Sequence, residues 1–338
     1  MKRIGNLYEK IYDFSNLYES YIKARKNKRY RQEVMEYTSN LEENLIILQN
    51  ELVWGEYKIG NPRIFTIFVP KIREIKALPF KDRVLQHSLN SVIEPYFENS
   101  FYYYSYACRK DKGTHRASLK VQEWLYIAEK NDKNLYCLKC DIKKFFNSVD
   151  LKILVKIIEK RIKDKKVIWL IKQILGKAQK GMPIGSLTSQ LFANVYLNEL
   201  DNFVKHKLKI KKYMRYMDDF IIFSEDKKEL HLILSKIEDF LKVNLDLELN
   251  NKTRIHPVKT GVEFVGYVHF FNKIRIRKSS WKRFKKNLEK TRKSYKNNKI
   301  TVETYNSTIG SYAGHVKHTK NLEIINKIEK MKRDRSDQ

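Results

Sequence analysis

The stretch that decides the fold is Tyr213-Met214-Arg215-Tyr216-Met217-Asp218-Asp219-Phe220-Ile221-Ile222-Phe223. Apolar and aromatic runs on both sides of the aspartate pair predict a strand, a tight turn and a second strand, with both carboxylates at the hairpin tip. Adjacent carboxylates repel each other, so they occur where water solvates both or where a divalent cation binds them. A solvated turn would explain an isolated Asp-Asp pair. The flanking strands favour a metal-binding hairpin instead.

This hairpin resembles the active-site hairpin of reverse transcriptases, and a second motif supports the resemblance. Residues 135–140 predict a strand that ends in Asp141, and the aromatic Phe146 follows five positions later, as in the first metal-binding motif of that family. Asp141 alone would be interpreted as a helix N-cap. Two-metal nucleotidyl transfer needs these carboxylates together, because cations roughly 3.5–4 Å apart must activate the primer hydroxyl and stabilise the leaving pyrophosphate.

The resemblance implies a catalytic set and a metal-binding set that overlap. The catalytic residues are Asp141, Asp218 and Asp219, and Ile142 joins them as a metal-binding residue. The implied cofactor is a pair of Mg²⁺ ions, for which Mn²⁺ can substitute.

The charge balance points to a polyanionic partner. The chain has 338 residues, with 69 Lys plus Arg against 39 Asp plus Glu and a formal net charge of +30. Such an excess suits nucleic acid, and the length allows two or three packed subdomains. The sequence shows neither an apolar run of membrane-spanning length nor a signal-peptide pattern at its start. We therefore expect a cytoplasmic protein, bacterial or phage-encoded.

The three cysteines, Cys108, Cys137 and Cys140, predict free thiols rather than a disulfide framework, because their number is odd in a long chain of intracellular character. Cys137 and Cys140 have the spacing of half a zinc site. No second Cys pair or nearby His pair completes it, so buried structural thiols are the preferred interpretation.

The chain divides into three predicted regions. Residues 1–54 form a helical extension that contains the basic run 23–29, which suits either solvent or a nucleic-acid backbone. Residues 55–270 form the fingers and palm, with a strand over 65–69, a helix over 154–175 and a palm helix over 228–245. Residues 271–338 form a small thumb that is helical and densely basic from Lys273 through Lys299.

Several residues match nucleotide-binding positions of the reverse transcriptases related to bacterial group II introns. Arg73, with Lys71 as second choice, matches the position that holds the triphosphate, and an Arg fork pairs with phosphate oxygens bidentately. Phe146 matches the steric gate that excludes a 2′-hydroxyl, although a core aromatic would account for the same residue. Lys252 could assist the leaving pyrophosphate.

The loop before residue 187 indicates which group of reverse transcriptases the chain resembles most. Intron-type enzymes place Gln before its second glycine and Pro after the Ser, whereas this chain has Ile184-Gly185-x-x-x-Ser189-Gln190. This variant, together with residues 311–318, looks like the reverse transcriptases of diversity-generating retroelements. That group copies a template-repeat RNA into cDNA with misincorporation opposite adenines. The nucleotide-binding set thereby gains Ile184, Gly185 and Gln190. A small, basic, oligomeric helical accessory protein is an implied partner, alongside template RNA, cDNA and dNTPs.

Further positions of the resemblance imply contact with template or primer. Arg83 opens a helix and Arg109 lies in a basic loop. Tyr216 and Met217 precede the aspartate pair, and Gly266 and Tyr267 belong to a primer-grip hairpin over 261–267. The loop around Arg109 also fits a plain core-plus-loop interpretation. His315 and His318 invite a zinc interpretation, but RNA contact or thumb packing is preferred because no acidic or thiol partner is evident.

Together these motifs predict an α+β right hand with fingers, a palm built on an antiparallel sheet backed by helices, and a small helical thumb. The predicted activity is Mg²⁺-dependent, RNA-directed DNA synthesis. A retron or phage-defence reverse transcriptase is the nearest alternative. An inactive RNA-binding scaffold is another, against which the intact Asp141, Asp218 and Asp219 argue.

Overall fold

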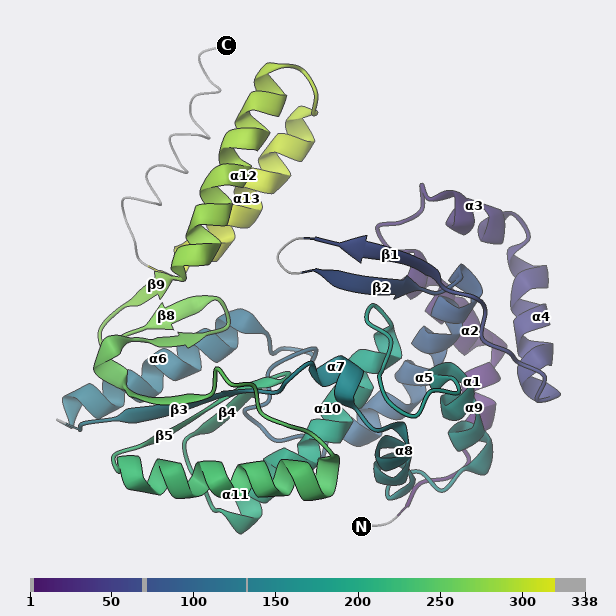
Figure 1. Ribbon diagram of the computed structural model, residues 1–338. Helices are drawn as coiled ribbons and strands as arrows, with labels where there is room; N and C mark the ends of the chain where they lie inside the picture. The colour runs from purple at the N-terminus through teal and green to yellow at the C-terminus, as the bar shows by residue number, and fades with distance from the viewer. Residues whose placement is uncertain (1–2, 69–71, 132, 320–338) are drawn as a thin grey trace. The chain divides into compact units, whose positions relative to one another are not determined.

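The computed structural model describes residues 3–68, 72–131 and 133–319. The chain has an α+β fold and forms two compact units, each assembled from three separate stretches of sequence (Figure 1). The first unit contains residues 1–108, 141–211 and 233–252, and the second contains residues 109–140, 212–232 and 253–338. No helix in the described part of the chain has the length and apolar character that crossing a membrane requires.

Helices dominate the first unit, and a long helix, α5 (Phe80–Glu98), lies at its centre. Four helices precede it, within the region predicted as an N-terminal helical extension: α1 (Tyr8–Tyr12), α2 (Phe14–Arg25), α3 (Gln32–Ser39) and α4 (Leu41–Val53). Asp13 starts α2 by accepting a hydrogen bond from the Asn16 amide. Helices α1, α2 and α3 pack on α5, as does α10 (Leu187–Asn202).

An exposed hairpin leads into α5. Strand β1 (Arg63–Ile67) pairs antiparallel with β2 (Arg73–Ala77), with Phe65 opposite Ile75. The hairpin is fixed at its base, where buried Asp82 of α5 accepts hydrogen bonds from the Tyr57 hydroxyl at 2.7 Å and the Gly60 amide at 3.1 Å. The predicted strand over 65–69 is thus real but begins two residues earlier, and its last residue lies outside the described part.

The helix predicted over 154–175 is two helices, α8 (Leu151–Glu159) and α9 (Lys165–Leu175). The break is caused by Asp164, whose carboxylate accepts hydrogen bonds from the amides of Lys166 and Val167 and starts a new helix. The Asp164 carboxylate also accepts hydrogen bonds from the amides of Leu7 and Tyr8, so it anchors the N-terminal segment as well. The short helix α7 (Phe145–Ser148) and a π-helical turn (Phe203–Lys207) complete this region.

A four-stranded sheet forms the base of the second unit, in the order β4 (Tyr213–Tyr216), β5 (Asp219–Ser224), β3 (Tyr136–Asp141) and β6 (Arg254–Pro257). Helix α6 (Thr114–Lys130) packs against β4, and the Trp124 ring meets Phe223 edge-on. Cys137 and Cys140 are buried in β3, as predicted for structural thiols. Helix α11 (Lys227–Leu245) follows the hairpin, close to its predicted bounds.

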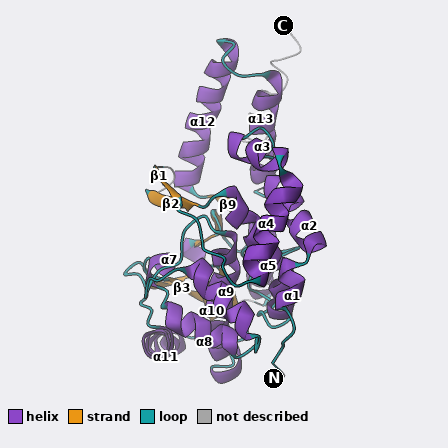
Figure 2. Cartoon of the chain, turned by 90° about the vertical axis from the view of Figure 1, so that its right-hand side faces the viewer, coloured by secondary structure: helices purple, strands orange, loops and turns teal. Residues whose placement is uncertain are grey.

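A second sheet and a helical pair follow in the second unit. The strands are β7 (Val262–Phe264), β8 (Tyr267–His269) and β9 (Ile274–Ile276), and the helices α12 (Lys278–Lys296) and α13 (Val302–Lys317) lie side by side (Figures 1 and 2). A short 3-10 turn (Val258–Thr260) precedes β7. The helix predicted from Lys273 was wrong over its first residues, because Ile274 and Ile276 alternate with exposed Arg275 and pair with β8.

The helical pair is held by one apolar cluster. Trp281 and Phe284 pack against it, as the predicted apolar stripe requires, and its buried members are Tyr267, Ile274, Ile276, Leu288, Tyr305, Ile309 and Val316. The helices of the predicted thumb therefore share one apolar core with the β7–β9 sheet.

Candidate active site

The aspartate pair lies on the β4–β5 hairpin, as predicted, but its two members occupy different positions. Asp219 begins β5 and pairs with Tyr216, so the turn consists of Met217 and Asp218 alone. Met217 takes the left-handed backbone conformation, with φ of 56°, at a turn position that usually carries glycine. The expectation that both carboxylates sit at the tip is corrected: Asp218 is in the turn and Asp219 is on the strand.

A buried arginine supports this turn and was missed in the sequence. The Arg215 side chain is fully buried, and its Nη1 donates to the Met217 carbonyl at 3.1 Å. A buried guanidinium needs such acceptors, because an unpaired charge away from water is strongly unfavourable. Arg215 thus ties the strand to the strained residue beside Asp218. The one sign of this role in the sequence was that Arg215 places a charged residue within an apolar strand, between Met214 and Tyr216.

Asp219 has a lysine neighbour from the same sheet. The Nζ of Lys139, on β3, lies 3.5 Å from Asp219 Oδ2 and donates to the Glu263 carbonyl at 2.7 Å. Strand β3 is the neighbour of β5 and ends at Asp141, two residues beyond Lys139. The lysine therefore neutralises part of the carboxylate charge at the start of β5.

Asp141 is positioned within the first unit by the segment that follows α11. The Asn250 side chain donates to Asp141 Oδ2 at 3.2 Å, and the Asn250 amide donates to the Asp141 carbonyl at 2.7 Å. The next residue, Ile142, forms an isolated antiparallel β-bridge with Leu249 of the same segment. Asn250 thus holds Asp141 by two hydrogen bonds, one to the carboxylate and one to the backbone carbonyl. It was not predicted, although the neighbouring Lys252 was.

The donor chemistry fits a hard divalent cation, because Mg²⁺ prefers carboxylate and carbonyl oxygens. Within residues 3–68, 72–131 and 133–319, no three His, Cys, Asp or Glu side chains are grouped closely enough to hold a metal ion. The ligand set Asp141, Ile142, Asp218 and Asp219 therefore stays a prediction.

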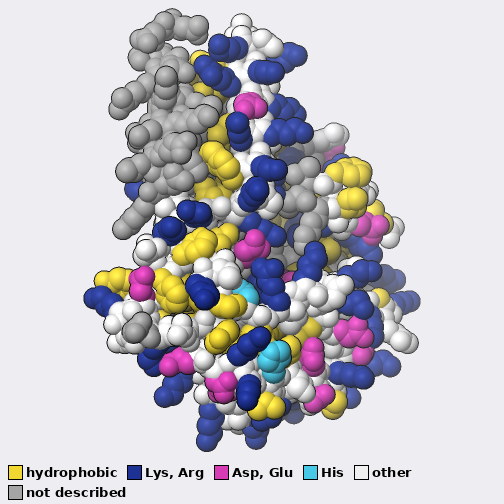
Figure 3. Space-filling model, turned by 60° about the vertical axis from the view of Figure 1, so that its left-hand side comes forward, with side chains coloured by type: hydrophobic (Ala, Val, Ile, Leu, Met, Phe, Trp, Pro, Cys, Tyr) yellow, Lys and Arg dark blue, Asp and Glu magenta, His cyan; other side chains and the backbone are white. Residues whose placement is uncertain are grey.

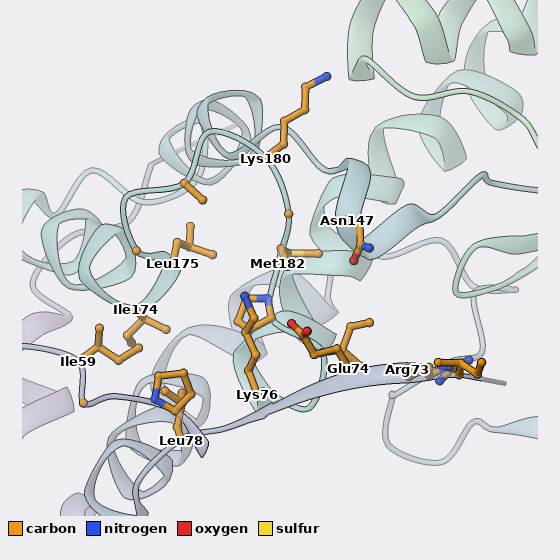
Figure 4. Close-up of a pocket in the computed structure, with 18 residues that line it drawn as sticks. Ile59, Arg73, Glu74, Lys76, Leu78, Asn147, Ile174, Leu175, Lys180 and Met182 are labelled. Carbon is orange, nitrogen blue, oxygen red and sulfur yellow. The ribbon is translucent and has the colours of Figure 1, made fainter. Parts of the chain in front are cut away.

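A pocket of about 530 Å³ in the first unit brings together predicted nucleotide-binding residues (Figure 4). Strand β2 supplies Arg73, and the glycine loop before α10 supplies Ile184. The side chains of Glu74 and Lys76 extend from β2 toward the part of the loop that carries Met182 (Figure 4). Four polar lining residues were not predicted, namely Glu74, Lys76, Asn147 and Lys180.

Backbone contacts fix the loop against both the strand and α7. The Lys76 amide donates to the Ile184 carbonyl at 3.3 Å, and the Met182 amide donates to the Phe146 carbonyl at 2.7 Å. Gly185 has φ of 103°, and a Cβ there would lie 3.1 Å from Ile75 Cγ2. Glycine is thus required for its backbone conformation and for its close approach to β2.

The remaining predicted nucleotide-binding residues lie elsewhere or outside the described part. Phe146 is half-buried, with its ring edge-on to Phe145, and only its backbone is bonded to the loop. Gln190 is exposed on α10 and Lys252 is exposed in a turn, and neither lines the pocket. Lys71 lies outside the described residues.

Two residues predicted to contact template or primer, Arg83 and Tyr267, instead bond to other residues of the protein. Arg83 forms an ion pair with Glu33 at 2.5 Å and lies over the Phe80 ring. Tyr267 is fully buried, and its hydroxyl donates to the His315 carbonyl at 3.0 Å, so its side chain cannot reach a primer. Gly266 precedes it in the β7–β8 turn. Arg109, Tyr216 and Met217 are half-buried and stay predictions.

The thumb histidines form a packed cluster. The His115 ring, from α6, stacks on His318 with centroids 4.0 Å apart, and His315 lies 3.0 Å from the Tyr267 hydroxyl through Nδ1. Burial and the neighbouring rings lower the pKa of His115 and His315 below the usual histidine range. This arrangement supports thumb packing as the role of the two C-terminal histidines.

Comparison with known proteins defines the class. The reverse transcriptase (RNA-dependent DNA polymerase) family matches residues 65–269, more than half of the chain. The chain belongs to this family, and its reverse transcriptase domain indicates an RNA-directed DNA polymerase.

Among curated proteins, the chain is 25% identical over 270 residues to protein YkfC of Escherichia coli, covering 66% of this chain and 70% of that protein. It is also 25% identical over 282 residues to the group II intron-encoded protein LtrA of Lactococcus lactis, covering 62% of this chain and 45% of LtrA. The retron Ec73 reverse transcriptase of Escherichia coli is 35% identical over 134 residues, with 36% of this chain and 42% of that enzyme covered. The chain thus spans less than half the length of the intron and retron enzymes.

Proposed function

We propose that this chain makes error-prone cDNA from a template-repeat RNA in a diversity-generating retroelement, in the cytoplasm of a bacterium. The observation that carries the proposal is Ile184, which lines the same pocket as Arg73. Where related polymerases present a Gln amide near the nucleotide, this chain presents an aliphatic side chain that can neither donate nor accept a hydrogen bond. The partners are the template RNA, dNTPs and a small basic helical accessory protein.

In the proposed reaction, Asp141, Asp218 and Asp219 would hold two Mg²⁺ ions. Bound there, the metals would activate the primer hydroxyl and stabilise the leaving pyrophosphate. The protein side chains prepare this site. Asn250 orients Asp141, Arg215 fixes the turn that carries Asp218, and Lys139 balances the charge of Asp219.

The pocket residues are assigned to nucleotide selection. Arg73 binds the triphosphate, while Ile184 leaves the base pair without one polar contact. A lost hydrogen bond is worth on the order of 1 kcal/mol, or several-fold in selectivity. That is too small to account for frequent errors alone, so Ile184 acts together with the hairpin around Arg73.

The test is Ile184→Gln, with deep sequencing of cDNA made on one RNA template. We expect misincorporation opposite template adenine to fall several-fold, with smaller changes at other bases. Ile59→Gln is the matched control, because Ile59 lines the same pocket and receives the same chemical change. Equal adenine error rates in wild type and Ile184→Gln would remove Ile184 from the mechanism while leaving the polymerase class intact.

A retron reverse transcriptase is the second candidate, favoured by the 35% identity to the retron Ec73 enzyme. The genetic locus discriminates between the two. A template repeat paired with a variable repeat supports the proposal, whereas a retron non-coding RNA beside the gene defeats it.

A further inference from the structure

One segment of the chain has a charge opposite to the rest. Residues 32–57 contain six glutamates and neither lysine nor arginine, in a protein with 69 Lys plus Arg and a net charge of +30. Elsewhere basic side chains predominate, as on the face shown in Figure 3. A segment without Lys or Arg is unsuited to binding nucleic acid, because phosphates bind where Lys and Arg gather.

Helix α4, within this segment, has an exposed apolar face. Its buried face packs through Leu45, Leu48 and Leu52. Helical geometry continues to Trp54, whose amide donates to the Asn50 carbonyl at 2.9 Å. The exposed residues recur at helical spacing and are Glu42, Glu43, Ile46, Ile47, Asn50, Val53 and Trp54.

The exposure of these apolar side chains is large. Trp54 is 75% exposed, and Ile47, one heptad earlier on the same face, is 46% exposed. Met35 of the neighbouring α3 is 52% exposed. Contiguous exposed apolar residues mark interaction sites, and tryptophan is enriched among the residues that dominate interface energies. The face is thus suited to being covered by another molecule.

The charges around the face restrict what can cover it. Glu42 and Glu43 lie at its N-terminal end, and the segment supplies no cation that could attract an RNA or an anionic membrane. A second copy of the chain that docked through the same face would place two such acidic segments, each with six glutamates and neither Lys nor Arg, against each other, which like-charge repulsion disfavours. A different protein with an apolar centre and a rim of Lys and Arg is complementary in both respects.

We propose that the outer face of α4 is the docking surface for a basic accessory protein, with Trp54 and Ile47 as its apolar anchors. The assignment rests on the proposed function for the existence of that partner, and it adds the place where the partner binds. The acidic end of the face selects the basic partner and excludes template RNA.

The first experiment places a photo-crosslinking amino acid at Ile47 of the full chain, expressed from its native locus. The control position is Val243 on α11, which is 80% exposed but lies near Lys236 and Lys242. We expect a covalent adduct at position 47 with one protein that has more Lys and Arg than Asp and Glu, and no such adduct at position 243. An adduct with RNA, with a second copy or with an acidic protein, or no adduct at all, would overturn the proposal.

The second experiment purifies the captured protein and measures its Kd for the full-length chain by calorimetry. Trp54→Ala and Ile47→Asp should each weaken binding by at least about tenfold, as expected for interface hot spots, while Val243→Ala leaves it unchanged. Primer extension on an RNA template with Mg²⁺ should stay at wild-type rate in all variants, which shows that they are folded. Equal Kd values for Trp54→Ala and Val243→Ala would refute the docking surface. Adenine errors, measured separately through Ile184→Gln, would still test the proposed function.

Discussion

Two antiparallel hairpins, β1–β2 and β4–β5, differ mainly in burial. Every residue of β1 is exposed, including Phe65 at 39%, whereas Phe220, Ile221 and Ile222 of β5 are fully buried. The first hairpin is fixed at its base through Asp82 and touches the glycine loop through Lys76, whereas the second is part of a four-stranded sheet. We therefore expect the first hairpin to suit a side chain that adapts to each incoming nucleotide, and the second to suit carboxylates that must keep one geometry.

The contrast predicts very different costs for the same substitution. Phe220→Ala should lower the free energy of unfolding by about 3–5 kcal/mol, because it leaves a cavity in a packed sheet. Phe65→Ala should change it by less than about 1 kcal/mol, because an exposed ring loses little on truncation. Urea denaturation of both variants checks this. Similar losses would mean that the β1–β2 hairpin is as well packed as β4–β5.

Removing a carboxylate from the buried hairpin should affect chemistry rather than folding. Asp218→Ala should reduce primer extension to below about one per cent of wild type, a loss of roughly 2.7 kcal/mol of transition-state stabilisation, because a metal ligand is gone. RNA binding and thermal stability should stay close to wild type, as for Asp141→Ala. Asp239→Ala, an exposed aspartate on α11, is the control and should extend primers normally. Extension by Asp218→Ala well above that level would contradict its assignment as a ligand.

A substitution on the exposed hairpin should instead affect substrate binding. Arg73→Ala should raise KM for dNTPs about tenfold or more with no change in thermal stability, because a charge-assisted contact to phosphate is worth roughly 1.5–3 kcal/mol. Arg63→Ala, on the partner strand opposite Ala77, tests whether any positive charge on the hairpin suffices. An equal rise in KM for both variants would point to general electrostatic attraction.

A third hairpin, β7–β8, carries a buried histidine, His269, that makes the stability of the fold depend on pH. Burial lowers the pKa of His269 to about 4, against an ordinary value near 6.5, with a smaller opposing effect from the Phe264 backbone. The folded state therefore favours the neutral ring. Its contribution to stability is complete above pH 6.5 and falls as the pH drops toward 4.

Acidification from pH 7.5 to 5.5 should thus cost about 1 kcal/mol of unfolding free energy through His269. His115 and His315, whose pKa values are also lowered, add to the loss in the same direction. In His269→Gln the difference between urea curves at the two pH values should shrink. An unchanged difference would show that His269 is not the group that titrates.

The sequence predicted the β4–β5 hairpin because its apolar runs and turn residues are local signals. It could not predict Arg215 beneath the turn or Lys139 beside Asp219, because both roles depend on strand order and burial. Strand β9 was missed because the dense Lys and Arg around Ile274 and Ile276 hide a short alternation. The break at Asp164 was missed because the apolar spacing continues on both sides of it, while the cap depends on one side chain.

The two compact units also have a consequence for the order of folding. The chain passes between them five times, at residues 108, 140, 211, 232 and 252, so each is built from segments far apart in sequence. During synthesis, at about 5–20 residues per second, the first unit cannot be completed until residue 252 has emerged, although its N-terminal helices are made first. Contacts between distant segments slow folding, because long loops must close before those contacts form. Neither unit can therefore be excised as a continuous fragment, and expression of a truncated chain ending near residue 211 should yield an incompletely folded protein that requires chaperones.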